Sequence, residues 1–198
     1  MCGIAGYMPS GSWGMPVLAA MTGCLAHRGP DAEGFHLDGR AAFGHRRLTV
    51  IDPDGGAQPR VDAATGDMLV FNGEIYGFKD HAKELRAKGL PLADNSDTEV
   101  LFQYLRNIGL EATLEKIDGM FAFAWLEGRT GRLRLARDRF GEKPLFWGLR
   151  HNTLVFGSEI KAVQSHPLFA DAQLDIEALE QQLDSYYEQS LASNLMAR

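Results

Sequence analysis

The order of its predicted elements constrains the fold of this chain more than any other feature of the sequence. Apart from one early helix, short strand patterns come first, two well-marked helices follow, and strand hairpins come last. This order lacks the repeated strand–helix–strand units that build a parallel sheet. It is the pattern of an α+β protein with layered antiparallel sheets.

Hydrophobic periodicity predicts the individual elements. Strands are expected at 3–8, 33–37, 41–51, 68–71, 120–126, 133–136, 144–149 and 153–157, and helices at 17–26, 78–88, 97–109, 111–116 and 160–164. The clearest helix start is the capping-box pattern Ser96-Asp97-Thr98-Glu99 before an apolar run. Gly89 is the expected C-terminal cap of the helix before it. A last amphipathic helix is predicted from Ile176 toward Leu195.

Composition narrows the class of protein. The 198 residues are 45% hydrophobic and 23% charged, which fits a globular protein with a substantial core. The formal net charge of -6 argues against a nucleic-acid backbone as the main partner. The two cysteines, Cys2 and Cys24, provide no disulfide framework, and the sequence shows neither a signal peptide nor a membrane-spanning run. We therefore expect a cytoplasmic protein that binds neither nucleic acid nor membrane.

Cys2 is the first candidate for chemistry because it directly follows the initiator methionine. Removal of Met1 would place a thiol and a free α-amine on one residue, with ordinary pKa values of roughly 8.5 and about 7.7–8.0. A nucleophile that carries its own base needs no separate histidine. The competing interpretation is a small apolar residue that begins a buried strand, and position alone favours it.

Asn72-Gly73 follows an apolar run and also has two interpretations. Asn-Gly is the strongest short signal for a β-hairpin turn. The segment 74–77 is too short for a return strand, however, and a helical pattern follows it. The functional interpretation uses the Asn carboxamide and the Gly backbone N–H as two donors to a developing oxyanion, with glycine permitting close approach.

Arg47 and Asp97 form a complementary pair for an amino-acid ligand, because a guanidinium suits an α-carboxylate and a carboxylate suits an α-ammonium. The alternatives are a solvated charge on a half-exposed strand for Arg47 and a first-turn anion favoured by the helix dipole for Asp97. The six histidines show no paired ligand spacing, and CxxC, HExxH, Walker and GxGxxG motifs are missing from the sequence. We expect no metal site.

Taken together, a series of ordered motifs resembles the N-terminal glutaminase domain of glutamine-hydrolysing asparagine synthetases. The motifs are MCGIAG at 1–6, HRGPD at 27–31, GHRRLTVID at 44–52, FNGEIY at 71–76, SDTEV at 96–100, DGMFAFA at 118–124, ARDRFGEKPL at 136–145 and SEIKAV at 158–163. That family belongs to the class II glutamine amidotransferases, among the N-terminal nucleophile hydrolases. HRGPD, ARDRFGEKPL and SEIKAV favour the asparagine synthetase branch over relatives that make purine precursors or amino sugars. The resemblance reverses the interpretation of Cys2.

The resemblance implies a four-layer αββα sandwich that hydrolyses L-glutamine to L-glutamate and ammonia through a cysteinyl thioester. It implies Cys2 as the nucleophile and Asn72 with Gly73 as the oxyanion hole. The substrate-binding residues that it implies are Arg47, Leu48, Thr49, Val50, Ile51, Glu74 and Asp97. The glutaminase domain is expected over residues 1–170, with a helical tail or the start of a linker at 171–198. The alternative function is a catalytically idle module with a regulatory or partner-binding role.

The family continues into an ATP-pyrophosphatase domain with an SGGxDS loop, which these 198 residues do not contain. We expect the glutaminase step to need no cofactor, and ATP and Mg to serve only that synthetase domain, present in cis or in trans. A homodimer is compatible with the resemblance. The sequence leaves open the ammonia acceptor, the oligomeric state, the removal of Met1, and whether the chain is a fragment or free-standing.

Overall fold

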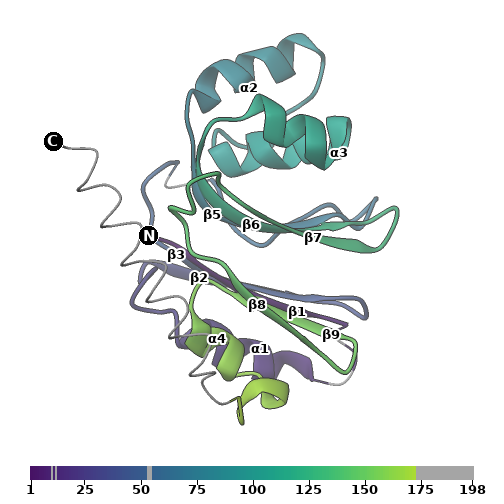
Figure 1. Ribbon diagram of the computed structural model, residues 1–198. Coiled ribbons are helices and arrows are strands. Elements are labelled where there is room, and N and C mark those ends of the chain that lie inside the picture. Colours follow the sequence, from purple (N-terminus) through teal and green to yellow (C-terminus); the bar gives the residue numbers. More distant parts are fainter. Residues whose placement is uncertain (10, 12, 53–54, 173–198) are drawn as a thin grey trace, which may run out of the picture.

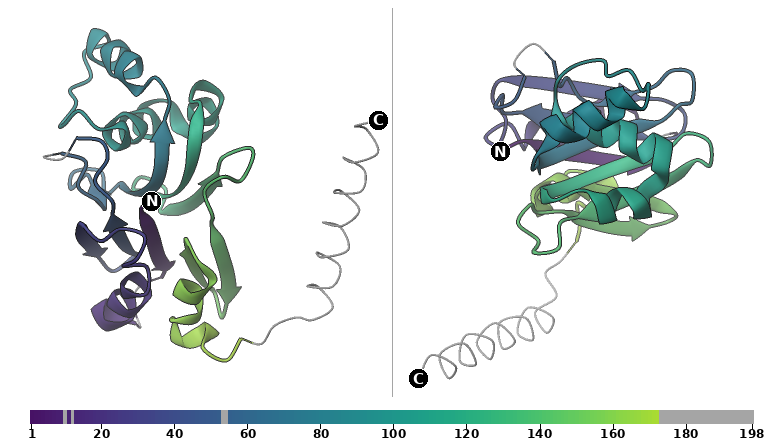
Figure 2. Two further views of the ribbon diagram at one scale, coloured as in Figure 1. Left: turned by 90° about the vertical axis from the view of Figure 1, so that its left-hand side faces the viewer. Right: turned by 90° about the horizontal axis from the view of Figure 1, so that it is seen from above.

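The computed structural model describes residues 1–9, 11, 13–52 and 55–172. Two sheets lie face to face, and helices cover the outer face of each (Figures 1 and 2). Every described strand pair is antiparallel. This is the predicted four-layer αββα sandwich. The helix predicted from Ile176 toward Leu195 and most of the predicted 171–198 tail lie outside the described residues.

The first sheet has the strand order β2-β3-β1-β9-β8. Its strands are β1 (Gly3–Met8), β2 (Ala32–Leu37), β3 (Ala42–Arg47), β8 (Phe146–Arg150) and β9 (Thr153–Gly157). The N-terminal strand β1 lies in the centre, paired with β3 on one side and β9 on the other. Helices α1 (Gly14–Gly23) and α4 (Ile160–Gln164), with the 3₁₀ helix η1 (Pro167–Phe169), cover the outer face. The chain start is thereby fixed in the middle of a sheet.

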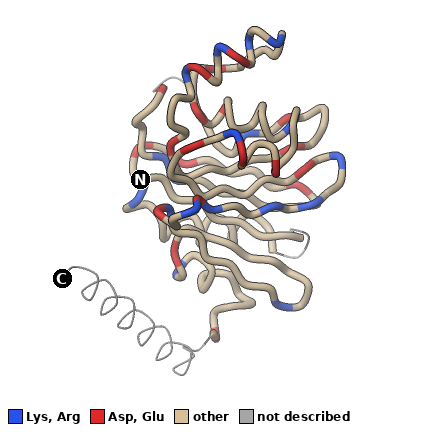
Figure 3. Tube along the Cα trace, turned by 45° about the horizontal axis from the view of Figure 1, so that its top comes forward, with Lys and Arg blue, Asp and Glu red and all other residues tan. Residues whose placement is uncertain are grey.

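The second sheet has the order β4-β5-β6-β7. Its strands are β4 (Arg60–Val61), β5 (Met68–Ile75), β6 (Gly119–Glu127) and β7 (Arg132–Arg137), and helices α2 (Phe78–Ala87) and α3 (Asp97–Lys116) cover it. The predicted start of α3 is confirmed, because Ser96 is its N-cap and accepts the Glu99 N–H on Oγ at 3.1 Å. The reciprocal bond of a capping box is not formed, since Ser96 N–H donates to Asp94 Oδ1 at 3.0 Å. The outer helix α2 carries interspersed acidic and basic residues (Figure 3), with Lys83–Asp80 and Lys88–Glu84 ion pairs at 2.7 Å. That face of α2 is solvated.

The structure corrects several predicted boundaries. The strand predicted at 41–51 ends at Arg47, because its partner β2 begins at Ala32, which lies opposite Arg47. The helix predicted at 17–26 begins earlier, at Gly14, and ends at Gly23. The break predicted between the helices at 97–109 and 111–116 is confirmed, because Gly109 has a non-helical φ of 80° and α3 consists of two helical segments on either side of this kink. The strand predicted at 68–71 continues to residue 75, because β6 pairs with its whole length.

Alternation along two strands brings selected side chains to the layer between the sheets. On β5, Met68 and Val70 pack in the inter-sheet core, whereas Leu69 packs beneath α2 and α3. Asn72 continues the face of Met68 and Val70. On β1, Ile4 belongs to the same inter-sheet core, so Cys2, two residues earlier, is directed to that side as well.

Candidate active site

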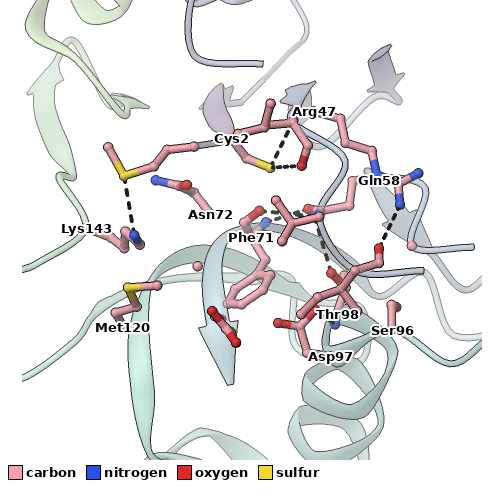
Figure 4. A pocket seen from close by; sticks show the side chains of 17 residues that line it. Cys2, Arg47, Gln58, Phe71, Asn72, Ser96, Asp97, Thr98, Met120 and Lys143 are labelled. Atoms are coloured by element: carbon pink, nitrogen blue, oxygen red, sulfur yellow. Dashed lines mark hydrogen bonds between the residues drawn. The ribbon is translucent and has the colours of Figure 1, made fainter. Parts of the chain in front are cut away.

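A pocket of about 230 Å³ opens at one end of the inter-sheet layer (Figure 4). Among the residues predicted from sequence, it is lined by Cys2, Arg47, Leu48, Val50, Ile51, Asn72, Gly73, Glu74 and Asp97. Thr49 does not line it, and its backbone N–H donates to the Asp31 carboxylate at 2.7 Å. The other lining residues are Met1, Gly56, Gln58, Phe71, Ser96, Thr98, Met120 and Lys143. Segments far apart in sequence thus meet at one cavity.

Cys2 is held by contacts on both its side chain and its backbone. Leu48 N–H donates to Cys2 Sγ at 3.4 Å, and Arg28 Nε donates to the Cys2 carbonyl oxygen at 3.0 Å. Burial raises the pKa of the Cys2 thiol, while the Leu48 backbone, the N-terminal amine and Arg47 act in the opposite direction. Thiolate formation near neutral pH therefore requires a nearby base or further positive charge.

Asn72 supplies a buried donor that has no acceptor. The residue is 1% exposed, and its Nδ2 makes no hydrogen bond with any described residue. An unsatisfied buried polar group costs about 1–3 kcal/mol, so native structures keep such groups rare and an exception calls for an explanation. In this pocket, the explanation that fits is a ligand oxygen that accepts the hydrogen bond.

The backbone N–H of Gly73 is a second donor directed to the pocket. On the β5 edge that faces away from β6, Phe71 N–H donates to Gln58 Oε1 at 2.6 Å and Ile75 N–H donates to Asp97 Oδ2 at 3.2 Å. N–H directions alternate along a strand, so Gly73 N–H lies on the same edge between these two. No side chain or loop in the described part of the chain accepts it.

The Asn72-Gly73 pair is not a turn. It lies inside β5, where Asn72 is opposite Ala122 and Gly73 is opposite Phe121. A Cβ on Gly73 would collide with the backbone oxygen of Met120. Glycine is therefore required by the close approach of β6, and the hairpin interpretation is wrong.

Arg47 and Asp97 reach the pocket from different elements. Arg47 ends β3, and its Nη2 donates to the carbonyl oxygens of Ile51 and Asp52 at 3.2 and 2.7 Å, which closes the loop that lines the pocket. Asp97 is the first residue of α3 and accepts the N–H of Thr98 at 2.9 Å. It is therefore a first-turn anion and a pocket residue at once.

The Asp97 carboxyl group lies in the pocket together with a second acidic residue. Burial raises its pKa to about 6, and the charge of Glu74 acts in the same direction. Glu74 lines the same pocket. A positively charged ligand group beside Asp97 would favour its ionised form.

Sequence reasoning missed three residues that shape the site. The Gln58 side chain bonds the backbone of Phe71 as a neighbouring strand would. Its Oε1 accepts the Phe71 N–H at 2.6 Å, and its Nε2 donates to the Phe71 carbonyl oxygen at 3.1 Å. Its segment has no periodicity that could have indicated this. Arg28 and Lys143 lie in the motifs HRGPD and ARDRFGEKPL, which were the available signals.

Two further observations concern cofactors and membranes. In the described part of the chain, no group of three or more His, Cys, Asp or Glu side chains is placed to hold a metal ion. No described helix has the length and apolar character needed to cross a membrane.

A cysteine at the start of the central strand of an αββα sandwich, beside two free hydrogen-bond donors, defines the class of N-terminal nucleophile hydrolases. Within it, the chain belongs to the family of glutamine amidotransferase domains, whose family model matches residues 1–196. The homologues are glutamine-hydrolysing asparagine synthetases. The resemblance indicated by the sequence motifs is therefore confirmed.

The match to individual relatives covers most of this chain but only part of each relative. The chain is 39% identical over 173 residues to asparagine synthetase [glutamine-hydrolyzing] 3 of Bacillus subtilis (strain 168), which covers 84% of this chain and 28% of that protein. For asparagine synthetase [glutamine-hydrolyzing] 1 of the same organism, the values are 38% over 165 residues, 83% and 26%. The chain thus spans about a quarter of the length of these relatives.

A solved structure supports the fold. The glutamine phosphoribosylpyrophosphate amidotransferase from B. subtilis aligns with a TM-score of 0.68 and 22% identity. The alignment covers 81% of this chain and 42% of that chain. This match shows the shared fold alone.

Proposed function

We propose that this chain is a glutaminase that hydrolyses the side-chain amide of L-glutamine to L-glutamate and ammonia. The observation that carries the proposal is the buried Asn72 Nδ2, which has no acceptor and shares a pocket with Cys2. An amide donor of this kind suits the oxygen of a tetrahedral intermediate. The names of the relatives, which specify glutamine hydrolysis, support the choice of substrate.

The substrate is oriented by its charged end. Arg47 binds the α-carboxylate, and Asp97 and Glu74 bind the α-ammonium group. The segment from Leu48 to Ile51 borders the ligand. Within it Leu48, Val50 and Ile51 line the pocket, whereas the contact of Thr49 with Asp31 holds the segment in place.

The chemistry is acyl transfer through Cys2. The α-amine of Cys2, directly or through one water, takes the thiol proton, and the thiolate attacks the side-chain carbonyl carbon of glutamine. Asn72 Nδ2 and Gly73 N–H stabilise the oxyanion. The protonated amine then returns its proton to the departing nitrogen, which leaves as ammonia. Water hydrolyses the glutamyl thioester to glutamate and regenerates the thiol.

Met1 must be removed for this mechanism to operate. In the unprocessed chain the nitrogen of Cys2 is an amide and cannot act as a base. Met1 itself lines the pocket, and its Sδ lies 3.3 Å from Lys143 Nζ. Processing therefore supplies the base and clears part of the cavity. Intact mass reports the state of the N-terminus, and a Met1-bearing sample that hydrolyses glutamine as fast as the processed one contradicts this requirement.

The wider reaction follows from the relatives and is part of the proposal. Residues 1–170 form the glutaminase domain, and residues 171–198 lead toward a synthetase domain that uses the ammonia, in cis or in trans. Glutamine hydrolysis needs no cofactor, and ATP and Mg serve only the synthetase step. The names of the relatives make aspartate the first acceptor to test.

The decisive experiment measures glutamate, ammonia and asparagine together in a sample shown by intact mass to lack Met1. We expect equal amounts of glutamate and ammonia, the same rate with and without Mg-ATP and aspartate, and no asparagine. Cys2→Ala is the control for contaminating glutaminase. Asparagine formation by this chain alone contradicts the proposal. Absence of hydrolysis in a folded sample that still binds glutamine by calorimetry favours the binding-module alternative.

A further inference from the structure

Lys143 is a buried cation that the proposed mechanism does not use. The residue is 6% exposed and lines the pocket. Its Nζ has one polar contact, the Met1 Sδ at 3.3 Å, and no carboxylate in the described ranges pairs with it. Lysine is rarely buried without a partner, because an uncompensated charge is costly to remove from water. A dashed line from Lys143 in Figure 4 marks the contact of its ammonium with Met1 Sδ.

The loop before Lys143 holds this residue in place. Lys143 N–H donates to Asp138 Oδ2 at 3.0 Å, and Arg137 Nε donates to the Lys143 carbonyl oxygen at 2.8 Å. Asp138 also accepts Phe121 N–H at 3.2 Å, which ties the loop to β6. Gly141 has a φ of 67°, and a Cβ there would press on the Arg137 guanidinium. The conformation of the loop thus fixes the backbone from which Lys143 reaches the pocket.

Processing leaves this ammonium close to the reactive residue. Met1 is bonded to Cys2, so the 3.3 Å contact with Met1 Sδ places Lys143 Nζ within roughly 10 Å of the Cys2 nitrogen by covalent geometry. Once Met1 is removed, its thioether no longer covers the charge. The space between Lys143 and the new α-amine then belongs to the pocket.

Other charged side chains line the same cavity as Lys143. The guanidinium of Arg47 is the second cation, and Glu74 and Asp97 are the carboxyl groups that line the pocket. Burial raises the pKa of the Cys2 thiol. Asp97 raises this pKa further, whereas Arg47 lowers it. In the glutamine complex these three groups are occupied by the substrate's own charges. Lys143 is then the remaining pocket cation without a partner.

We propose that Lys143 is a positioning residue that acts through charge: in the Met1-free chain, its ammonium favours the thiolate and the neutral α-amine of Cys2. The consequence for catalysis rests on the proposed function, but the effect on Cys2 itself does not. A cation at this separation, with an effective dielectric constant near 20, changes a neighbouring pKa by on the order of one unit. Both changes increase the fraction of Cys2 that is ready to attack at neutral pH.

The test measures how fast iodoacetamide alkylates Cys2 as a function of pH, by peptide mass spectrometry on Met1-free chains. Lys143→Met removes the charge at similar length, Lys143→Arg keeps it, and Lys79→Met removes a charge from an exposed position on α2. Cys24 in the same molecule is the internal reference. We expect the midpoint for Cys2 to rise by about one pH unit in Lys143→Met only, with the Cys24 profile unchanged.

Several outcomes overturn the proposal. They are an unchanged Cys2 midpoint in folded Lys143→Met, an equal rise in Lys79→Met, or a rise that Lys143→Arg shows as well. Folding is checked by thermal melting, and Lys143→Gln replaces Lys143→Met if the latter does not fold.

A second measurement separates this inference from the proposed function. The acidic limb of kcat/KM for glutamine should move to higher pH in Lys143→Met by the same amount as the alkylation midpoint. If the wild type hydrolyses glutamine but neither profile moves, the role of Lys143 fails and the function stands. If the alkylation midpoint moves but the wild type hydrolyses no glutamine, the function fails and the effect of Lys143 on Cys2 stands.

Discussion

The layer between the two sheets has an apolar half and a pocket half, and the same strands build both. On β1, Ile4 packs in the inter-sheet core and Cys2 lines the pocket. On β5, Val70 packs in the core, and Asn72, two residues further, lines the pocket. The two halves differ in their side chains: the apolar half consists of packed apolar residues, whereas the pocket half contains Asn72, whose buried Nδ2 has no partner among the described residues, and Lys143, whose Nζ contacts Met1 Sδ.

This contrast indicates that the two halves of the layer have different roles. Packed apolar side chains stabilise the fold, and that stability allows the adjacent end to retain unsatisfied donors and a buried charge. Stability and activity should therefore respond to different substitutions, although the substituted residues are neighbours. Substitutions in the two halves test that separation.

Cys2→Ala is expected to have the largest effect on activity. Loss of the nucleophile should lower glutamine hydrolysis by more than about 10³-fold, since no other group in the pocket can form the thioester. Glutamine should still bind, because Arg47 and Asp97 are unchanged, and calorimetry measures this. The melting temperature should stay close to that of the wild type. Turnover near the wild-type rate contradicts the role of Cys2.

Asn72→Ala should lower kcat by roughly 10²–10³-fold with little change in KM, as expected for loss of one oxyanion donor. The free energy of unfolding should fall by less than about 1 kcal/mol, because Nδ2 has no partner to lose. Steady-state kinetics and urea unfolding on one sample give both values. A folded variant with unchanged kcat leaves the buried amide without a catalytic role.

Met68→Ala makes the matching change on the same face of β5, in the apolar half. Met68 is fully buried, so its truncation should lower the free energy of unfolding by about 2–5 kcal/mol. The kcat of the folded fraction should stay within roughly threefold of wild type, since the residue does not line the pocket. A loss of kcat as large as that of Asn72→Ala would show that the two halves are not separable.

Asp97→Asn is expected to change the stability of the protein in a way that depends on pH. The folded-state pKa of about 6 lies above the ordinary 3.8, so ionisation of Asp97 costs stability as pH rises between these values. A rise of about two pKa units corresponds to about 3 kcal/mol, so without glutamine the variant should exceed the wild type by up to about 3 kcal/mol at pH 7 and by much less at pH 4. Urea unfolding across pH measures this difference. A difference that narrows as pH rises contradicts the assignment.

Patterns in the sequence predicted the class of fold and most element positions, and they indicated Cys2 as the candidate reactive residue. Ser96 indicated the start of α3 because its bond to the Glu99 N–H is a local interaction within one turn. The strand at 3–8 and the short helix at 160–164 were likewise predicted with the bounds observed. Cys2 was found from its position after Met1 and from the motifs that follow it, and its role as nucleophile stays a prediction.

The assembly of the pocket could not be predicted from local patterns, because the residues that line it are distant in sequence. Asn72-Gly73 has the local signature of a turn, yet β6 pairs with it and makes it the interior of a strand. The end of β3 at Arg47 depends on where β2 begins. Lys143 has no local signal of burial, since it is covered by Met1 from the other end of the chain. Local patterns report interactions within a few residues, whereas strand pairing and burial of charge depend on contacts that form only when the whole chain folds.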